Sequence, residues 1–593
     1  MSQQGPTNPL VSLDRVSFTY EGGGSPAVDD LCLGIAPGDF LGVIGPSGAG
    51  KTTLCSVLSG AVPHHFAGEF RGVATVCGMD SCEVGLTDVS RKVGSVLQDI
   101  DAQMVASSVE DEMLYGLENF GVPHDQIPGR IGEALATCGI SGLLHREVAT
   151  LSGGQKQKLA IAAILAIRPS VMVLDEPTAA LDPASSLMVF QTLRELNRRE
   201  GITVVVVEQK VALLCEFCRH VAVLREGRLA LLGTPREVFS HSEELRSMGV
   251  DSPRVTRVSN LLRSRGLARE GAVSLTVGEA VALVSRVVGE RGSLARAATR
   301  PPLRLEGGRR HGEPTALELA SDPMLTFDHV GFSYPGGTAS VEDVSLELRP
   351  GELVAVVGQN GAGKTTVTKL MNGLLKPSSG RVTIAGLDTS RARTSQIAQH
   401  VSTLFQDPDR QICKETVVEE VAFSLQLLGT PDAEALSRAR DCVEHFGLPA
   451  EAAPFSLGRG QRQIVALASV VVTNPEVLIL DEPTSGLDYR ECMTVMEAVE
   501  VARSRGCAVA MVCHDMEVVS DFATRVVVMA DGRVLADGLP GEVFADEGLL
   551  ARACVAAPQV TQLARRLSAD VSRGYEGVTE VHDIVAVTEG LVG

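Results

Sequence analysis

One phosphate-binding sequence occurs twice in this chain of 593 residues. The first copy reads Gly45-Pro46-Ser47-Gly48-Ala49-Gly50-Lys51-Thr52-Thr53, and the second reads Gly358-Gln359-Asn360-Gly361-Ala362-Gly363-Lys364-Thr365-Thr366. Each copy follows a short apolar run and opens a helix-like segment. In such a loop the glycines let backbone N–H groups turn toward phosphates, the lysine reaches the β- and γ-phosphates, and the first threonine ligates Mg²⁺. The sequence therefore predicts two sites for ATP and Mg²⁺.

A second motif is duplicated with the same spacing. Four apolar residues precede Asp175-Glu176 in the first copy and Asp481-Glu482 in the second, 306 residues later. Gln155 and Gln461 are separated by the same 306 residues. The repeat is thus two large domains and not a short-period array. Within each copy, strand-like runs alternate with helical patterns, which is typical of an α/β domain with a mostly parallel sheet.

The domain boundaries follow from this repeat. We expect a first lobe over residues 8–245 with a tail over 246–293, and a second lobe over 323–553 with a tail over 554–593. The tails share a pattern, because Ser252-Pro253-Arg-Val-Thr resembles Ala557-Pro558-Gln-Val-Thr. Residues 294–322, rich in Arg, Gly and Pro, are interpreted as a linker. A flexible chain of that length has a reach of ~30 Å, enough to let the two lobes face each other.

Composition excludes several classes of protein. Lys and Arg number 53 against 73 Asp and Glu, a net charge of −20, which argues against general nucleic-acid binding. No apolar run approaches the roughly 18 residues that span a bilayer. The first residues contain no apolar secretory core. The 13 cysteines form no disulfide framework, which fits a reducing compartment.

Between the phosphate loop and the Asp-Glu pair, the first lobe carries Leu151-Ser152-Gly153-Gly154-Gln155. With the two motifs above, this signature makes the chain resemble an ATP-binding-cassette ATPase over both lobes. The resemblance implies an α/β fold: two P-loop cassettes in tandem, each with a helical subdomain and a small β-subdomain, followed by short helical tails. It also implies that the lobes of one chain pair head-to-tail around two ATP molecules. Each ATP would contact one lobe's phosphate loop and the other lobe's signature.

The resemblance assigns roles to further residues by motif. Tyr20 and Tyr334 would stack on adenine, and Asp182 and Asp488 would reach across to the other lobe. Glu176 and Glu482 would polarise the attacking water, a role worth ~10²–10⁴-fold in rate. The implied Mg²⁺ ligands are Thr52, Gln98 and Asp175 in the first lobe and Thr365, Gln406 and Asp481 in the second. Gln98 and Gln406 would also relay the state of the nucleotide outward.

The segments after these glutamines narrow the resemblance. Gln406-Asp-Pro-Asp-Arg-Gln411, followed by Thr416-Val-Val-Glu-Glu, is similar to the energy-coupling-factor ATPases, and Gln98-Asp-Ile-Asp-Ala-Gln103 echoes it. This subfamily powers import of vitamins or of cobalt and nickel ions. Its partners are a transmembrane coupling protein and a small membrane protein that captures substrate. The resemblance thus implies that the chain lies at the cytoplasmic face of the cell membrane. The fused lobes, together with Val62-Pro63-His64, are most similar to subfamily members linked to thiamine precursors.

Two motifs depart from the family pattern. The spacing fixes the second signature as Leu457-Gly458-Arg459-Gly460-Gln461, so the signature serine and first glycine are replaced. The switch histidine is present as His514 in the second lobe, whereas Gln209 stands there in the first. A neutral amide can donate a hydrogen bond but carries no charge. In head-to-tail pairing both departures fall in one composite site, which we call site one.

Site one would contain Lys51, Glu176, Gln209 and the altered signature. Site two would contain Lys364, Glu482, His514 and the intact Ser152-Gly153-Gly154. We therefore expect site two to dominate hydrolysis. A rival interpretation is that Arg459 lies near the γ-phosphate and compensates with its charge, as a guanidinium does in phosphoryl transfer.

Two other functions stay open at this point. A tandem ATPase of a sugar importer shares the main motifs, but the Asp-x-Asp-x-Gln segments and the tails argue against it. A ribosome-associated tandem ATPase would also lack membrane spans. That class predicts a long charged helical linker and a basic surface, which the Pro-Pro and Gly-Gly linker and the acidic composition do not favour.

Overall fold

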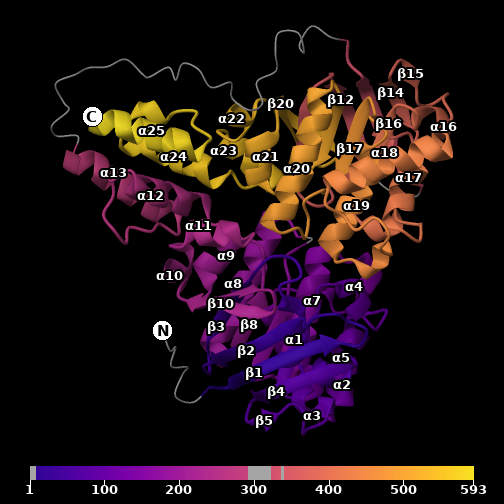
Figure 1. The fold of residues 1–593 in the computed structure, drawn as a ribbon. Coiled ribbons are helices and arrows are strands. Elements are labelled where there is room, and N and C mark those ends of the chain that lie inside the picture. Colours follow the sequence, from indigo (N-terminus) through magenta and orange to yellow (C-terminus); the bar gives the residue numbers. More distant parts are fainter. Residues whose placement is uncertain (1–8, 180, 292–321, 336–338) are drawn as a thin grey trace. The chain divides into compact units, whose positions relative to one another are not determined.

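The structure, a computed structural model, describes residues 9–179, 181–291, 322–335 and 339–593. The chain divides into two units (Figure 1). The first unit comprises residues 1–256 and 273–276, and the second comprises 257–272 and 277–593. The predicted linker, residues 294–322, lies outside the described residues except for Asp322.

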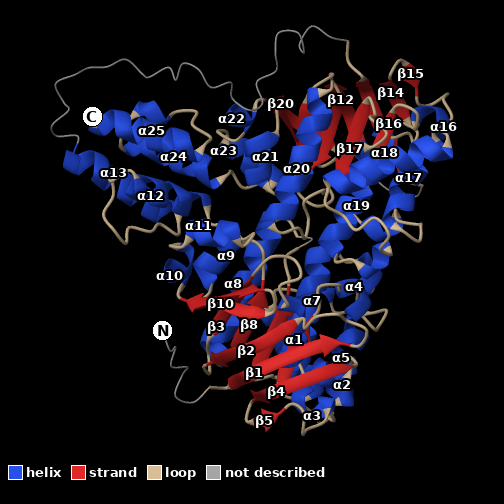
Figure 2. Ribbon diagram, in the orientation of Figure 1, coloured by secondary structure: helices blue, strands red, loops and turns tan. Residues whose placement is uncertain are grey.

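The first unit contains two sheets of different kinds (Figure 2). An antiparallel sheet has the order β2-β1-β4-β5. Its strands are β1 Val11–Tyr20, β2 Val28–Ile35, β4 Gly68–Val76 and β5 Met79–Asp80. A mostly parallel sheet has the order β10-β9-β3-β8-β7-β6. Its strands are β3 Phe40–Ile44, β6 Val93–Val96, β7 Val171–Asp175, β8 Thr203–Val207, β9 His220–Arg225 and β10 Arg228–Gly233.

Helices of the first unit cover the parallel sheet and form a separate helical region. Among them α5 and α6 both pack on α7, the helix that the signature motif opens. The helices are α1 Lys51–Leu58, α2 Ala61–His64, α3 Leu86–Ser90, α4 Ile100–Gln103, α5 Val109–Asn119, α6 Ile127–Thr137, α7 Gly153–Ile167, α8 Pro183–Glu200, α9 Val211–Phe217, α10 Pro235–Phe239 and α11 Ser242–Ser247.

The second unit repeats this architecture. Its antiparallel sheet has the order β12-β11-β14-β15, and its mostly parallel sheet has the order β16-β17-β18-β13-β19-β20. The strands are β11 Leu325–Ser333, β12 Ala339–Leu348, β13 Leu353–Val357, β14 Ser379–Ile384, β15 Leu387–Asp388, β16 Val401–Leu404, β17 Val477–Asp481, β18 Ala508–Val512, β19 Arg525–Ala530 and β20 Arg533–Gly538. The helices are α15 Lys364–Met371, α16 Thr394–Ile397, α17 Val417–Leu427, α18 Asp432–His445, α19 Arg459–Val471, α20 Tyr489–Ser504, α21 Met516–Phe522, α22 Pro540–Val543 and α23 Glu547–Ala553.

The tails are helical, and most of the first tail belongs to the second unit. The tail helices are α12 Arg254–Ser264, α13 Val277–Arg291, α24 Gln559–Asp570 and α25 Val581–Val592. α13 packs against α24 and α25, and Arg265 forms an ion pair with Glu589 at 2.5 Å. The C-terminal tails of the two copies therefore pack together in one helical cluster.

The central strands place the functional loops. β3, β7 and β8, and their counterparts β13, β17 and β18, are buried along their whole length, as expected for parallel strands covered on both faces. Ligands of such sheets bind at the carboxyl ends of the strands. Those ends carry the phosphate loop, the Asp-Glu pair and residues 208–210 in the first lobe. Among the described residues, no helix is long and apolar enough to cross a membrane.

Candidate active sites

The phosphate loops are closed by their own lysines. Each loop joins a buried strand to a helix that begins at the lysine, β3 to α1 and β13 to α15. Lys51 Nζ donates to Gly45 O and to Pro46 O, both at 2.8 Å. Lys364 Nζ donates to Gly358 O at 2.7 Å and to Gln359 O at 2.9 Å. Both ammonium groups are therefore held inside the loop, where phosphate oxygens would lie.

Glycine is required at the two ends of each loop. A Cβ on Gly45 would lie 2.4 Å from Leu224 O, and one on Gly50 would lie 2.3 Å from Ala27 O. The corresponding distances are 2.2 Å from Met529 O at Gly358 and 2.6 Å from Ser340 O at Gly363. Because neighbouring backbone fills the space of a side chain, only glycine fits at these positions.

In the first lobe, two predicted residues meet on the carboxylate of Glu176. Glu176 follows β7 directly and has a positive φ of 47°, an uncommon conformation for a residue other than glycine. Gln98 Nε2 donates to Glu176 Oε2 at 2.8 Å, and Gln209 Nε2 donates to Glu176 Oε1 at 2.8 Å. Gln209 thus occupies the switch position with a neutral donor.

The second lobe builds the same arrangement with a histidine. Glu482 has φ of 52°, and Gln406 Nε2 donates to Glu482 Oε2 at 3.2 Å. His514 Nε2 lies 3.1 Å from Glu482 Oε1, but its angles are not those of a hydrogen bond. This buried nitrogen has no hydrogen-bond partner among the described residues. It is therefore suited to bind an acceptor from a ligand such as a phosphate oxygen.

The two glutamates have opposite pKa shifts. Burial raises the pKa of Glu176 to about 7; Lys51 counteracts this, and the nearby carboxylate of Glu208 adds to it. Burial also disfavours ionisation of Glu482, but the contact with His514, together with Lys364, brings its pKa below the usual value. The charged form of the predicted water-polarising residue is thus better stabilised in the second lobe.

The predicted Mg²⁺ ligands lie beside the phosphate loops. Burial raises the pKa of Asp175, while a hydrogen bond with Thr52 opposes that rise. Burial and the neighbouring Glu482 raise the pKa of Asp481 to about 6. Within the described part of the chain, no group of three or more His, Cys, Asp or Glu residues could hold a metal ion. One carboxylate and one hydroxyl per lobe fit Mg²⁺, which commonly takes few protein ligands along with phosphates and water.

The signature helices begin differently in the two lobes. Ser152 caps α7, since its Oγ accepts from Gln155 N at 3.3 Å and Gln155 Oε1 accepts from Ser152 N at 3.0 Å. Gly458 occupies the same position before α19 and has no side chain to cap the helix. Replacing a serine cap by glycine costs only a few tenths of a kcal/mol in stability. The altered signature therefore has little effect on the stability of the helix.

Arg459 turns toward a loop of its own lobe. Its guanidinium carbon lies 3.7 Å from the position of a Cβ on Gly486, in the loop before α20. At Gly460 a Cβ would lie 2.1 Å from Glu491 Oε1, so the last signature glycine packs tightly against the start of α20. The rival interpretation, in which Arg459 serves the γ-phosphate, stays a prediction.

Asp182 and Asp488 each cap a helix of their own lobe. Asp182 accepts from Ser185 N at 2.8 Å at the start of α8, and Asp488 accepts from Glu491 N at 2.9 Å at the start of α20. That these aspartates reach toward the other lobe stays a prediction. The predicted adenine-stacking residues lie beside the phosphate-loop helices. Tyr20 is bonded to Thr53 Oγ1 at 3.1 Å, and Tyr334 lies 3.4 Å from Thr366 Oγ1.

The segment after each site glutamine is held by bonds that repeat in both lobes. Gln103 Oε1 accepts from Leu97 N at 2.9 Å, and Gln411 Oε1 accepts from Phe405 N at 3.3 Å. This explains the last glutamine of the Asp-x-Asp-x-Gln motif, because its side chain closes the loop around the site glutamine.

Two further kinds of contact recur in both lobes and were not singled out from the sequence. Asp101 pairs with Lys156 at 2.5 Å, and Asp409 pairs with Arg462 at 2.6 Å, each linking the segment to the signature helix. Buried Glu112 accepts from Val105 N, and buried Glu420 accepts from Cys413 N. Their recurrence at equivalent places in both copies was the available signal.

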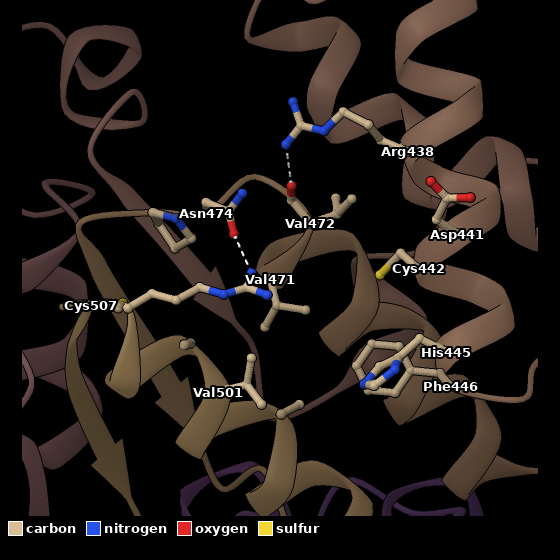
Figure 3. A pocket seen from close by; sticks show the side chains of 14 residues that line it. Arg438, Asp441, Cys442, His445, Phe446, Val471, Val472, Asn474, Val501 and Cys507 are labelled. Atoms are coloured by element: carbon tan, nitrogen blue, oxygen red, sulfur yellow. Dashed lines mark hydrogen bonds between the residues drawn. The ribbon is translucent and has the colours of Figure 1, made fainter.

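A cavity of about 420 Å³ lies elsewhere in the second unit, between α18, the end of α19 and α20 (Figure 3). Arg438 donates to Val472 O at 2.8 Å on one side, and Arg505 donates to Asn474 Oδ1 at 3.1 Å on another. The small Ala502 lines it. None of the predicted nucleotide-binding residues lines this cavity, so it is not part of the ATP site.

Known proteins match nearly the whole chain. The ABC transporter family model matches residues 28–179 and 341–485. A protein of Caldanaerobacter subterraneus subsp. tengcongensis is 33% identical over 551 residues, covering 91% of this chain and 93% of the relative. A protein of Methanosarcina acetivorans is 34% identical over 578 residues, covering 96% and 92%. Both relatives are named as ABC transporter ATP-binding proteins.

Among solved structures, cbiO1 from Clostridium perfringens, part of the ABC transporter complex cbiONQ, is 29% identical. The match covers 43% of this chain and 98% of that chain, with a TM-score of 0.37. The family match to both copies confirms the predicted fold class of two P-loop cassettes in tandem. The protein therefore belongs to the ABC transporter family, as an ATP-binding and ATP-hydrolysing chain with two cassettes.

Proposed function

We propose that this ATPase powers an importer of the energy-coupling-factor type. The observation that carries the proposal is the segment after each site glutamine. In both lobes its final glutamine closes the loop, and its second aspartate pairs with a cation on the signature helix. This construction links the catalytic glutamate, through Gln98 or Gln406, to the helical region. A partner docked on the helical region would respond to the state of the nucleotide.

The lobes of one chain pair head-to-tail in this proposal, so that each ATP contacts both. Lys51 and Lys364 hold the β- and γ-phosphates, and the loop N–H groups bind their oxygens. Thr52, Gln98 and Asp175 hold Mg²⁺ in one site, and Thr365, Gln406 and Asp481 hold it in the other. The ion supplies positive charge against the phosphates. Glu482 orients the water that attacks the γ-phosphate, and His514 stabilises the charge that develops there.

Site one is the weaker site in this proposal. Its Glu176 is harder to ionise than Glu482, its switch residue is neutral Gln209, and its signature comes from Gly458 and Arg459 of the other lobe. The orientation of Arg459 toward Gly486 of its own lobe supports a weakened site over a compensating arginine. Site one still keeps Lys51, Asp175 and Glu176, so it binds nucleotide and turns over slowly.

The partners in this proposal are a transmembrane coupling protein and a small membrane protein that captures substrate. The chain itself lies at the cytoplasmic face of the membrane. The substrate is a vitamin, a vitamin precursor such as a thiamine-related compound, or a cobalt or nickel ion. Since the substrate contacts the membrane proteins and not the cassettes, its identity depends on those partners.

Purification of the chain from its own membrane, with identification of the proteins that accompany it, tests the proposal. We expect one larger and one small integral membrane protein. Two large permeases with an extracytoplasmic sugar-binding protein would favour a sugar importer instead. Ribosomal proteins without membrane proteins would favour the ribosome-associated alternative and overturn the transport proposal.

A further inference from the structure

A group of polar side chains surrounds the loop between Glu176 and α8 in the first lobe. The described residues of this loop are 178, 179, 181 and 182. Ala179 N donates to Glu176 O at 3.2 Å, and Leu181 N donates to Thr178 O at 3.1 Å. It ends at Asp182, the cap of α8. Side chains from the turn after β8 attach to this loop as well.

Lys210 binds this loop at both ends. Its Nζ donates to Thr178 O at 2.8 Å, to Leu181 O at 3.2 Å and to Ser186 Oγ at 2.8 Å. Ser186, in the first turn of α8, in turn donates to Asp182 O at 2.9 Å. Hydrogen bonds from an ammonium group are roughly twice as strong as neutral ones. One side chain therefore joins the start of the loop, its end and the helix that follows.

Glu208 adds a second attachment. Its carboxylate is buried, with 2% of the residue exposed, and accepts from Thr178 Oγ1 at 2.5 Å. It also accepts from the backbone N–H groups of Gln209 at 2.9 Å and Lys210 at 3.1 Å. These bonds fix the turn after β8, from which Gln209 reaches Glu176 and Lys210 reaches the loop. Thr178 is fully buried between the two attachments.

The second lobe replaces this set as a whole. Cys513, Asp515 and Cys492 stand where the first lobe has Glu208, Lys210 and Ser186. Asp515 instead caps α21, accepting from Glu517 N at 2.9 Å, and Cys513 Sγ lies 3.8 Å from Thr484 Oγ1. An aspartate has no N–H to donate to loop carbonyls. The ammonium attachment is therefore specific to the first lobe.

We propose that Lys210, supported by Glu208, is a positioning residue that tethers the loop before α8 through Thr178 and Leu181 and thereby holds Asp182 in place for ATP turnover. In head-to-tail pairing, which rests on the function proposed above, this loop lies with Ser152 at site two. The first lobe would then have the neutral Gln209 at its own switch position. It would also supply a tethered loop to site two, the more active site. A small displacement of such a loop lowers the catalytic rate more than it weakens nucleotide binding.

The test compares Lys210→Met with Lys210→Arg in the full-length chain. Methionine has a similar length and no donor, whereas arginine keeps several. We expect Lys210→Met to raise hydrogen exchange in the peptide that contains Thr178 and Leu181, and to lower kcat about 10-fold with KM changed less than about twofold. Lys210→Arg should restore most of kcat. Lys158→Met is the matched control, because the exposed Lys158 Nζ makes a weak contact, 3.7 Å from Met188 Sδ.

Unchanged exchange around Thr178, or an unchanged kcat, would overturn the proposal. If Lys210→Met fails to fold, Thr178→Val removes the bond to Glu208 with little change in shape, and the same exchange and kcat are measured. Backgrounds in which one glutamate is changed to glutamine separate the tether from the pairing of lobes. Loss of rate in the Glu176→Gln background supports action at site two. Loss only in the Glu482→Gln background supports the tether but contradicts head-to-tail pairing.

Discussion

The predicted catalytic glutamates of the two lobes have the same backbone conformation and different surroundings. Both have positive φ, and both contact a glutamine from the preceding segment. Glu176, however, is bonded to neutral Gln209 and lies near the buried carboxylate of Glu208, whereas Glu482 contacts His514. The pKa of Glu176 is raised to about 7 and that of Glu482 is lowered. Duplication has thus preserved the geometry of the site while its electrostatics diverged.

The loop before α8 and its counterpart before α20 also differ, in the side chains that attach them. The first lobe fixes this loop with Lys210 and Glu208, and the second lobe has Asp515 and Cys513 in their place. The lobe whose glutamate has the raised pKa therefore carries the lysine attachment of this loop. If each ATP is shared between lobes, these differences are complementary, since a loop and a glutamate of different lobes serve the same nucleotide.

The strongest test of the comparison is loss of each glutamate in turn. Glu482→Gln should lower ATP hydrolysis by ~10²–10⁴-fold, because it removes the ionised group that orients water. Glu176→Gln should lower it much less, since site one contributes little. Steady-state phosphate release from the full-length chain measures both rates. Equal losses would contradict the inequality of the sites and favour two equivalent sites with different chemistry.

A second test exchanges the signature residues. Ser152→Ala should lower hydrolysis ~10- to 150-fold, because a hydrogen bond to a charged phosphate is worth ~1.5–3 kcal/mol. Ser152→Thr keeps both the hydroxyl and the helix cap and should retain most activity. A thermal melt measures the stability lost with the helix cap, ~1 kcal/mol, so that this loss can be separated from the loss of catalysis. A fall in rate explained wholly by lost folded protein would remove Ser152 from the site.

Much of this comparison was available from the sequence. The phosphate loops, the Asp-Glu pairs and the altered positions 209 and 458 follow from motif spacing, since both copies keep the same offsets. The structure then places Gln98 and Gln209 on Glu176, where a motif predicts proximity but not the bonded atoms. Their chemical roles stay predictions.

The tether of the first lobe could not be read from motifs. Lys210 immediately follows the switch residue, and nothing in its spacing says that its side chain turns back to carbonyls about 30 positions earlier. Only the backbone path from β8 into α9 sets that direction. A signal existed in the joint change of residues 186, 208 and 210 between the copies, but single substitutions of this kind are common in duplicated domains. The orientation of Arg459 was unpredictable for the same reason.

A third prediction restores the switch residue of the first lobe. In the Glu482→Gln background, Gln209→His should raise the residual hydrolysis about three- to tenfold, because a histidine adds positive charge beside Glu176 and the γ-phosphate. The rate is measured with saturating Mg-ATP. Gln209→Asn is a matched control that shortens the amide and adds no charge. No gain from histidine would show that the altered signature, and not Gln209, limits site one.

The smallest expected difference concerns the ion pairs that join each site to its signature helix. Arg462 contacts both carboxylate oxygens of Asp409, from Nε at 2.6 Å and from its terminal nitrogen at 3.2 Å, whereas Lys156 meets Asp101 through one nitrogen. A two-point arginine pair fixes geometry better than a single ammonium contact. Asp409→Asn should therefore lower ATP hydrolysis stimulated by the membrane partners about two- to fivefold, since exposed pairs are worth ~0.2–1 kcal/mol. Asp101→Asn should lower it less. The measurement compares the complex in lipid vesicles with the chain alone, whose basal rate provides the reference. A larger effect at Asp101 would mean that coupling runs chiefly through the first lobe, and that the better-formed pair of the second lobe serves folding instead.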